Sequence, residues 1–169
     1  SLMLHMANAT IVLILCAILT PLLATKVRAP ALCGALYFAL HPLQCEAVVW
    51  ASCQPYLLAS LLGGLSLLCF IKSLEPPKRR FLYITSIGLF AVSLLSKSIF
   101  ASLPALVGIL RYAKEGSGRF TFKMVRRDWP FWFLSLCAFI LSFWARAADP
   151  SNRAVSWVER IKLVPAFFG

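Results

Sequence analysis

Charged residues are scarce in this chain of 169 residues. They make up 14% of the sequence, against about 25% in a typical soluble domain, and hydrophobic residues make up 60%. The mean hydropathy is +0.82. This composition excludes an ordinary soluble domain and indicates a membrane protein. The apolar runs are continuous, not short and alternating, so they predict membrane helices and not a barrel.

Familiar motifs of enzymes and metal sites are also missing. The sequence has no Walker loop, no G-x-G-x-x-G, no G-x-S-x-G and no H-E-x-x-H. Its six cysteines form no C-x-x-C pair, so neither a metal site nor a thiol redox site is expected. If the stretch between Cys45 and Cys53 is helical, the two residues lie about 12 Å apart, too far for a disulfide.

Six apolar segments follow one another along the chain, at residues 2–23, 31–40, 56–71, 81–95, 99–110 and 129–144. A full crossing needs about 20 apolar residues, so the second and fifth segments are short. Membrane proteins tolerate short or broken helices where these line a cavity. The first segment has no basic start and no clear cleavage site, which favours a membrane segment over a signal peptide. We predict one all-α, multi-pass membrane domain over residues 1–169, with no soluble domain.

Basic residues gather in every second connection between these segments. They are Lys26 and Arg28, then Lys72, Lys78, Arg79 and Arg80, then Arg111, Lys114, Arg119, Lys123, Arg126 and Arg127. In a six-pass chain these connections share one side, which the positive-inside rule assigns to the cytoplasm, stroma or matrix. The tail that begins near Arg146 is also basic, although a six-pass chain places it on the opposite side. We base the assignment on the three basic connections. Juxtamembrane charge thus explains the net charge of +11, so we expect lipids and not nucleic acid as partners.

The opposite side of this six-pass arrangement collects His5, His41, Glu46 and Lys97. An ionisable side chain near membrane depth is costly, so it usually faces a cavity, a partner or a substrate. Glu46 and Lys97 therefore fit a polar cavity, a structural ion pair, or simple exposure at the interface. His41 precedes Pro42, which ends a helix, so it also fits a helix end without a chemical role. His5 is typical of an interfacial position.

Several further residues predict packing and not chemistry. The adjacent glycines Gly63 and Gly64 predict a close approach of two helices, and Pro104 predicts a kink in the fifth segment. Trp129, Trp132 and Trp144 are placed as in the aromatic belts at the two ends of a membrane helix.

One stretch carries a family resemblance. Residues 35–50, ALYFALHPLQCEAVVW, resemble the LFALHPVHVEAVAW stretch of the transmembrane and tetratricopeptide-repeat O-mannosyltransferases and their bacterial relatives. Residues 4–10, LHMANAT, are similar to the LLHALNA helix that precedes it in the family. Residues 94–98, LLSKS, with SLP at 102–104, are similar to the LLSKPMAVTLP stretch that follows it. The resemblance covers about residues 4–110.

The resemblance implies a GT-C-type membrane glycosyltransferase scaffold, here as a partial bundle. Such enzymes take a sugar from a polyprenyl-phosphate donor on the lumenal side, in the endoplasmic reticulum or another organelle membrane. Glu46 would then lie in the second lumenal loop as the candidate catalytic carboxylate. Lys97 would bind the donor phosphate, and His41 would shape the cavity or bond the donor. A cation facing a lipid phosphate is electrostatically reasonable.

The chain also departs from that family. The family's acidic pair precedes the LLHALNA helix, at which this chain begins, and residues 52–56, SCQPY, are uncharged where the family has a charged run. A fragment or a reduced relative is therefore expected. Glu46 alone is a weak basis for catalysis, since a lone carboxylate still needs a placed donor and acceptor, so the enzyme assignment stays open.

The alternative is a non-catalytic structural subunit that retains the scaffold. Such a subunit would sit beside other membrane subunits in a larger complex, for example a photosynthetic or respiratory one. We expect no pigment or haem ligation by His5 or His41, because no paired-histidine pattern occurs.

Overall fold

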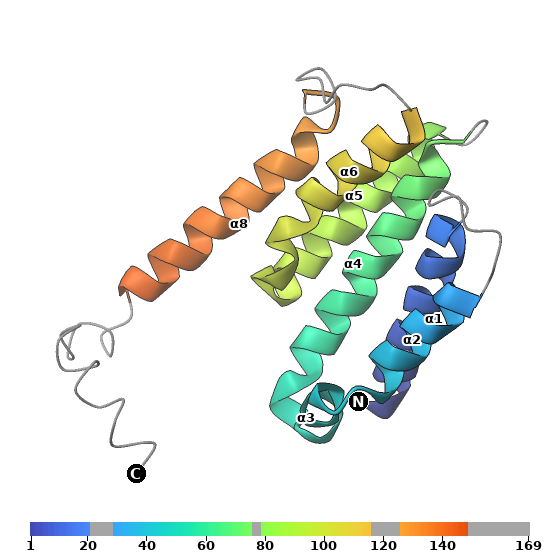
Figure 1. The fold of residues 1–169 in the computed structure, drawn as a ribbon. Helices are drawn as coiled ribbons and strands as arrows, with labels where there is room; N and C mark the ends of the chain where they lie inside the picture. Colours follow the sequence, from blue (N-terminus) through green and yellow to red (C-terminus); the bar gives the residue numbers. More distant parts are fainter. Residues whose placement is uncertain (21–28, 76–78, 116–125, 149–169) are drawn as a thin grey trace, which may run out of the picture.

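The computed structural model describes residues 1–20, 29–75, 79–115 and 126–148, and all regular structure in these ranges is helical (Figure 1). The helices are α1 (Leu2–Leu19), α2 (Ala29–Leu40), α3 (Leu43–Val49), α4 (Gln54–Ser73), α5 (Arg79–Ser96), α6 (Leu103–Glu115) and α8 (Trp129–Ala148). Two 3-10 turns, η2 (Ala51–Cys53) and η3 (Ser98–Ser102), precede α4 and α6. Each predicted apolar segment overlaps a described helix, although residues 21–23 lie outside the described ranges.

Three of the described helices, α1, α4 and α8, are long and apolar enough to cross a membrane. Helix α2 is apolar but has only 12 residues. At 1.5 Å per residue it is about 18 Å long, against a hydrocarbon core of about 30 Å. The all-helical membrane class is therefore supported, whereas the predicted six crossings are not confirmed.

The fifth predicted segment is divided. Residues 98–102 form the 3-10 turn η3, and α6 begins at Leu103. Pro104 lies in the first turn of α6, where a missing backbone N–H removes no intrahelical bond. The expected kink is thus wrong: Pro104 starts a helix and does not bend one.

Helix α4 lies between α1 and α5 and packs most extensively on α5 (Figure 1). Its two glycines allow a close approach to α1 and to η3. A Cβ on Gly64 would lie 2.7 Å from Cγ2 of Ile11, and one on Gly63 would lie 2.8 Å from the ring of Phe100. The close approach predicted from this pair of glycines is confirmed.

Hydroxyl groups join α4 to α5 inside the bundle. The Ser66 hydroxyl donates to the carbonyl of Ser86 at 2.8 Å, and the Ser86 hydroxyl donates to the carbonyl of Ser66 at 2.7 Å. Ser93 of α5 donates to the carbonyl of Ala59 at 2.8 Å. All three serines are buried. Such interhelical bonds suit an apolar bundle, where few other groups can bond a hydroxyl.

The core beside this contact between α4 and α5 is aromatic. Phe131 of α8 meets Phe70 edge-on at 5.8 Å between ring centroids and lies 5.5 Å from Phe90. Leu67 of α4 and Leu103 and Val107 of α6 complete the buried cluster. Beyond Phe131, α8 diverges from the other helices (Figure 1) and leaves large apolar side chains exposed along most of its length.

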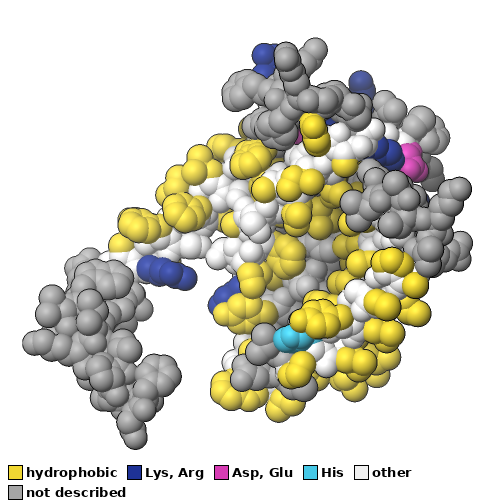
Figure 2. All heavy atoms as spheres, viewed as in Figure 1, with side chains coloured by type: hydrophobic (Ala, Val, Ile, Leu, Met, Phe, Trp, Pro, Cys, Tyr) yellow, Lys and Arg dark blue, Asp and Glu magenta, His cyan; other side chains and the backbone are white. Residues whose placement is uncertain are grey.

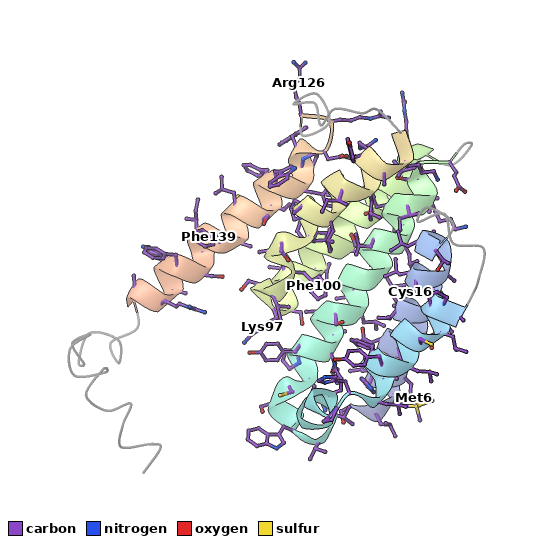
Figure 3. The ribbon with its side chains drawn as sticks, in the orientation of Figure 1. Met6, Cys16, Lys97, Phe100, Arg126 and Phe139 are labelled. Carbon is purple, nitrogen blue, oxygen red and sulfur yellow. The ribbon has the colours of Figure 1, made fainter. Side chains whose placement is uncertain are left out.

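The chain alternates between two ends of the bundle (Figure 1). We call one the basic end, defined by Lys72, Arg80, Arg111, Lys114, Arg126 and Arg127. The other, which we call the Lys97 end, carries Lys97, His41, α3 and the final turn of α8. Figure 3 labels Arg126 and Lys97, which lie toward opposite ends. The described basic residues of the second and third basic connections thus lie at one end of the bundle, whereas Lys26 and Arg28 lie outside the described residues, and the side of a membrane that this end faces stays a prediction.

Candidate functional site

The three residues predicted to bind substrate come from the same end of the bundle. His41 follows α2, Glu46 lies in α3, and Lys97 lies between α5 and η3. The ring of His41 meets that of Tyr37 edge-on at 4.9 Å, whereas the Lys97 ammonium lies over the ring of Tyr56. The side chain of Glu46 lies outside the described residues, as does that of Cys45. The structure thus leaves the Glu46–Lys97 ion pair a prediction.

Lys97 occupies a break in the helical chain. Its backbone is extended, with φ −161° and ψ 134°, and its N–H donates to the carbonyl of Ser93 at 3.0 Å. Next to it, the Ser96 hydroxyl donates to the carbonyl of Pro55 at 3.0 Å, which ties the break to the start of α4. The position of Lys97 is therefore fixed by both helices of the α4–α5 pair.

The Lys97 ammonium lies over an aromatic face. Its Nζ is 4.6 Å from the centroid of the Tyr56 ring, and the side chain is exposed. A cation–π contact at an exposed site contributes about 0.5–1 kcal/mol, enough to orient the side chain. A ring face holds an ammonium without using its N–H donors, so these remain able to bond an anion.

A small cavity of about 190 Å³ lies next to this break, between η3 and α8. Its lining combines hydroxyls, apolar surface and a cation: Ser98, Ala101, Phe139, Ser142, Phe143 and Arg146. In Figure 2 basic side chains flank the open space between the far part of α8 and the bundle. The Ser135 hydroxyl donates to the carbonyl of Ala101 and so fixes η3 against α8. The sequence analysis noted Arg146 only as part of a basic tail that did not fit the charge pattern. The structure adds it to the candidate site.

His5 is buried between α1 and α2. Its Nε2 lies 3.1 Å from the carbonyl oxygen of Ala39, and its ring stacks on Phe38 at 5.8 Å. Its Nδ1 is buried without a described partner. Asn8, one turn further along α1, donates to the carbonyls of Leu4 and Leu57. These contacts fix α1 against α2 and α4, so His5 has a packing role here, and its depth in a membrane stays a prediction.

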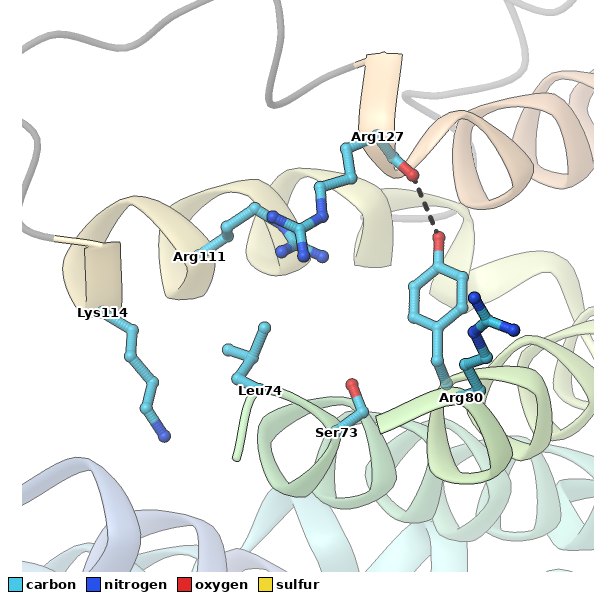
Figure 4. Close-up of a pocket in the computed structure, with 7 residues that line it drawn as sticks. Ser73, Leu74, Arg80, Arg111, Lys114 and Arg127 are labelled. Atoms are coloured by element: carbon cyan, nitrogen blue, oxygen red, sulfur yellow. Dashed lines mark hydrogen bonds between the residues drawn. The ribbon is translucent and has the colours of Figure 1, made fainter. Parts of the chain in front are cut away.

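A second cavity, at the basic end, was not predicted. It has about 330 Å³ and is lined by Ser73, Leu74, Arg80, Tyr83, Arg111, Lys114 and Arg127 (Figure 4). The sequence analysis treated these basic residues as topology signals alone. These basic residues surround one cavity because α4, α5, α6 and the start of α8 meet at the same end of the bundle. No short sequence motif indicates that meeting.

One wall of the second cavity is a buried ion pair. Arg111 donates through Nε and one Nη to the two carboxylate oxygens of Asp128, each at 2.6 Å. Arg111 is 2% exposed and Asp128 1% exposed. The Tyr83 hydroxyl donates to the carbonyl of Arg127 at 3.2 Å and lies 3.4 Å from the Asp128 carboxylate. The pair and the tyrosine connect α5, α6 and the start of α8.

A second ion pair at this end is exposed. The Lys114 ammonium donates to the Glu75 carboxylate at 2.9 Å. This bond and the charge of Lys114 hold the pKa of Glu75 below its ordinary value of 4.5. Among the described residues, no group of three or more His, Cys, Asp and Glu side chains is placed to hold a metal ion.

No protein-family model, curated protein or solved structure matches this chain.

Proposed function

We propose that this chain is the membrane portion of a GT-C-like glycosyltransferase and binds a polyprenyl-phosphate-linked sugar at its Lys97 end. The proposal rests on the exposed Lys97 ammonium over the Tyr56 ring and on a partly apolar cavity that is lined by the next residue in the chain, Ser98. A polyprenyl phosphate has an anionic head and an apolar chain. It needs a cation near the membrane surface and an apolar wall beside it.

The residues around Lys97 fit these two requirements. Lys97 donates to the phosphate, and Arg146, on the rim of the 190 Å³ cavity, adds a second positive charge at the same end. Phe139 and Phe143 of α8 offer apolar surface to the first isoprene units. His41 and Glu46, on the α2–α3 side of the same end, are proposed to face the sugar. If the basic end faces the cytoplasm, the donor binds on the lumenal side.

The proposal concerns donor binding, with Glu46 as the candidate for the chemical step. Sugar transfer also needs a placed acid or base. The two carboxylates whose side chains the structure describes, Glu75 and Asp128, both belong to the basic end. We therefore assign no second catalytic group.

Donor binding can be tested with the full chain in detergent micelles and dolichyl phosphate as the probe. We expect Lys97→Gln to weaken binding by about tenfold, the effect of losing one charge-assisted hydrogen bond. Lys97→Arg should retain most of the affinity, because it keeps the charge. Lys72→Gln is the matched control, since Lys72 is an exposed lysine at the basic end. Equal affinities of the Lys97→Gln and Lys72→Gln variants would refute the proposal.

The alternative, a non-catalytic subunit of a larger membrane complex, is favoured by one observation. Phe131 is the one buried residue described for α8, and the helix exposes Phe133, Leu136 and Ile140 along its apolar surface. Lipid tails or a neighbouring subunit can cover such a surface. Dolichyl phosphate binding that needs Lys97 favours the glycosyltransferase-like function, whereas recovery of a stoichiometric membrane partner without donor binding favours the alternative.

A further inference from the structure

The side chain of Tyr56 carries a hydroxyl group next to the proposed donor-binding residue Lys97. Tyr56 lies in the first turn of α4 and is 40% exposed. Its ring lies below the Lys97 ammonium, and among the described residues its hydroxyl has no hydrogen-bond partner. The Tyr83 hydroxyl, at the basic end, differs because it donates to a backbone carbonyl. The Tyr56 hydroxyl is therefore able to bond a ligand.

The backbones that carry Tyr56 and Lys97 are tied together. The Ser96 hydroxyl donates to the carbonyl of Pro55 at 3.0 Å, and these two residues directly precede Lys97 and Tyr56 in the chain. One turn earlier in α5, the Ser93 hydroxyl makes a second bond to a carbonyl of α4 at 2.8 Å. Groups held by packed helices keep a more precise geometry than groups on loops. The ring and the ammonium thus share one fixed support.

The ammonium and the hydroxyl together offer two kinds of donor. The Lys97 Nζ is 4.6 Å from the centroid of the Tyr56 ring, and this contact with the ring face uses none of its three N–H donors. The phenolic O–H is a further donor on the edge of the same ring. A phosphate group presents several oxygens on one atom, and each accepts charge-assisted bonds of about 2.5–2.9 Å. One phosphate can therefore accept from both side chains.

We propose that Tyr56 is a second binding residue for the donor phosphate. Its hydroxyl donates to one phosphate oxygen while the Lys97 ammonium donates to another, and its ring keeps the ammonium in place. This inference rests on the proposed function and adds a residue and two separable roles to it. The competing interpretation is a tyrosine of the membrane interface, whose hydroxyl contacts water or any headgroup. The two interpretations predict different results for the loss of the hydroxyl.

The hydroxyl is tested with the full chain in detergent micelles and with two probes, dolichyl phosphate and dolichol. Tyr56→Phe keeps the ring and removes the hydroxyl. We expect it to weaken the binding of dolichyl phosphate by about tenfold, because one bond to a charged group is lost, and to leave the binding of dolichol unchanged. The melting temperature should not change. Tyr37→Phe is the matched control, since Tyr37 is an exposed tyrosine of α2 and keeps its ring contact with His41.

The ring is tested with Tyr56→Leu, which removes the aromatic face as well. We expect a further loss of about two- to fivefold relative to Tyr56→Phe, which corresponds to the loss of an exposed cation–π contact. In a chain that also carries Lys97→Gln, the two variants should bind dolichyl phosphate equally, because the ring acts only through the ammonium. A difference that persists without the ammonium would overturn the positioning role.

The results separate this inference from the proposed function. A loss in Tyr56→Phe that is absent in Tyr37→Phe and is confined to dolichyl phosphate supports a bond to the phosphate. Equal losses in the two tyrosine variants, or an equal loss with dolichol, would overturn it. If Lys97→Gln weakens binding and Tyr56→Phe does not, the donor site stands and the role of the hydroxyl is wrong. If neither variant weakens binding, the proposed function fails together with this inference.

Discussion

Among the described residues, two charged side chains are almost fully removed from solvent, those of Arg111 and Asp128. Burying a charge is costly, and the cost is offset here by two short hydrogen bonds and by the nearby Tyr83 hydroxyl. Arg111 also lies over the ring of Phe70, with its guanidinium carbon 5.2 Å from the centroid. The pair therefore joins the end of α6 to the start of α8 and to the aromatic core.

Asp128→Asn removes one charge and leaves Arg111 buried without its partner. We expect this variant to lose about 3–5 kcal/mol of stability, the usual cost of breaking a buried pair from one side. The double variant Arg111→Met with Asp128→Leu should lose much less, because no unpaired charge remains. Thermal unfolding in detergent measures both. If the double variant were the less stable of the two, the pair itself would be the stabilising feature and this account would be wrong.

Glu75 gives a pH dependence with a definite sign. Lys114 lowers the pKa of Glu75 in the folded chain, so the stabilisation is complete above the unfolded value. It is lost as the pH falls through the lower, folded value, that is, below about 4.5. The effect is small because the pair is exposed and screened by salt. Unfolding midpoints of Glu75→Gln and the unchanged chain should converge at low pH and differ slightly at neutral pH.

At the scale of elements, the pair of glycines in α4 sets how closely the helices approach. Gly64→Ala would put a methyl group 2.7 Å from Ile11, whose β-branched side chain has little freedom to move. We expect a loss of about 1–3 kcal/mol, typical of overpacking. Gly88→Ala on α5 is the matched control, because a Cβ there has no heavy atom within 4 Å. Gly88→Ala should be neutral or slightly stabilising, since alanine favours a helix. Equal unfolding midpoints for the two variants would contradict this view of the α1–α4 contact.

The sequence predicts helices better than it predicts where they end. Long apolar runs give α1, α4 and α8 directly, because nothing else can bury such runs in a membrane. The helix α3 was not expected, since residues 43–49 are too few for periodicity to indicate a helix. The effect of Pro104 was predicted wrongly for a related reason: a proline inside an apolar run indicates a kink or a helix start equally well.

For the candidate sites, prediction from the sequence is limited because the sites depend on contacts between residues that are far apart in the chain. Lys97 was predicted from a short stretch of sequence, but its support by Tyr56 joins residues 41 positions apart. Arg80 and Lys114 were visible only as loop charges, and their shared cavity depends on how α5 and α6 pack. Single-sequence reasoning identifies the residue types that could act. It does not show which of them meet.

At the scale of the whole molecule, the two ends carry different chemistry, and their placement across a membrane is testable. In a variant without native cysteines, single cysteines at positions 98 and 126 should react with a membrane-impermeant maleimide from opposite sides. Position 126 should react from the cytoplasmic side, because the basic connections favour that side. Labelling of both positions from one side would show that the described helices do not place the two ends across the bilayer. The check is gel-shift labelling of sealed vesicles before and after permeabilisation.

The serine bonds between α4 and α5 have a consequence for how the protein is assembled. Bonds at Ser66, Ser86, Ser93 and Ser96 run along one seam between two helices that are neighbours in the sequence. Sliding either helix by one turn would break all of them at once, so the seam admits a single register. These contacts are local, whereas those of α1 and α8 to the seam join parts of the chain that are synthesised at different times. The α4–α5 hairpin can therefore form as a finished unit, against which earlier and later helices dock.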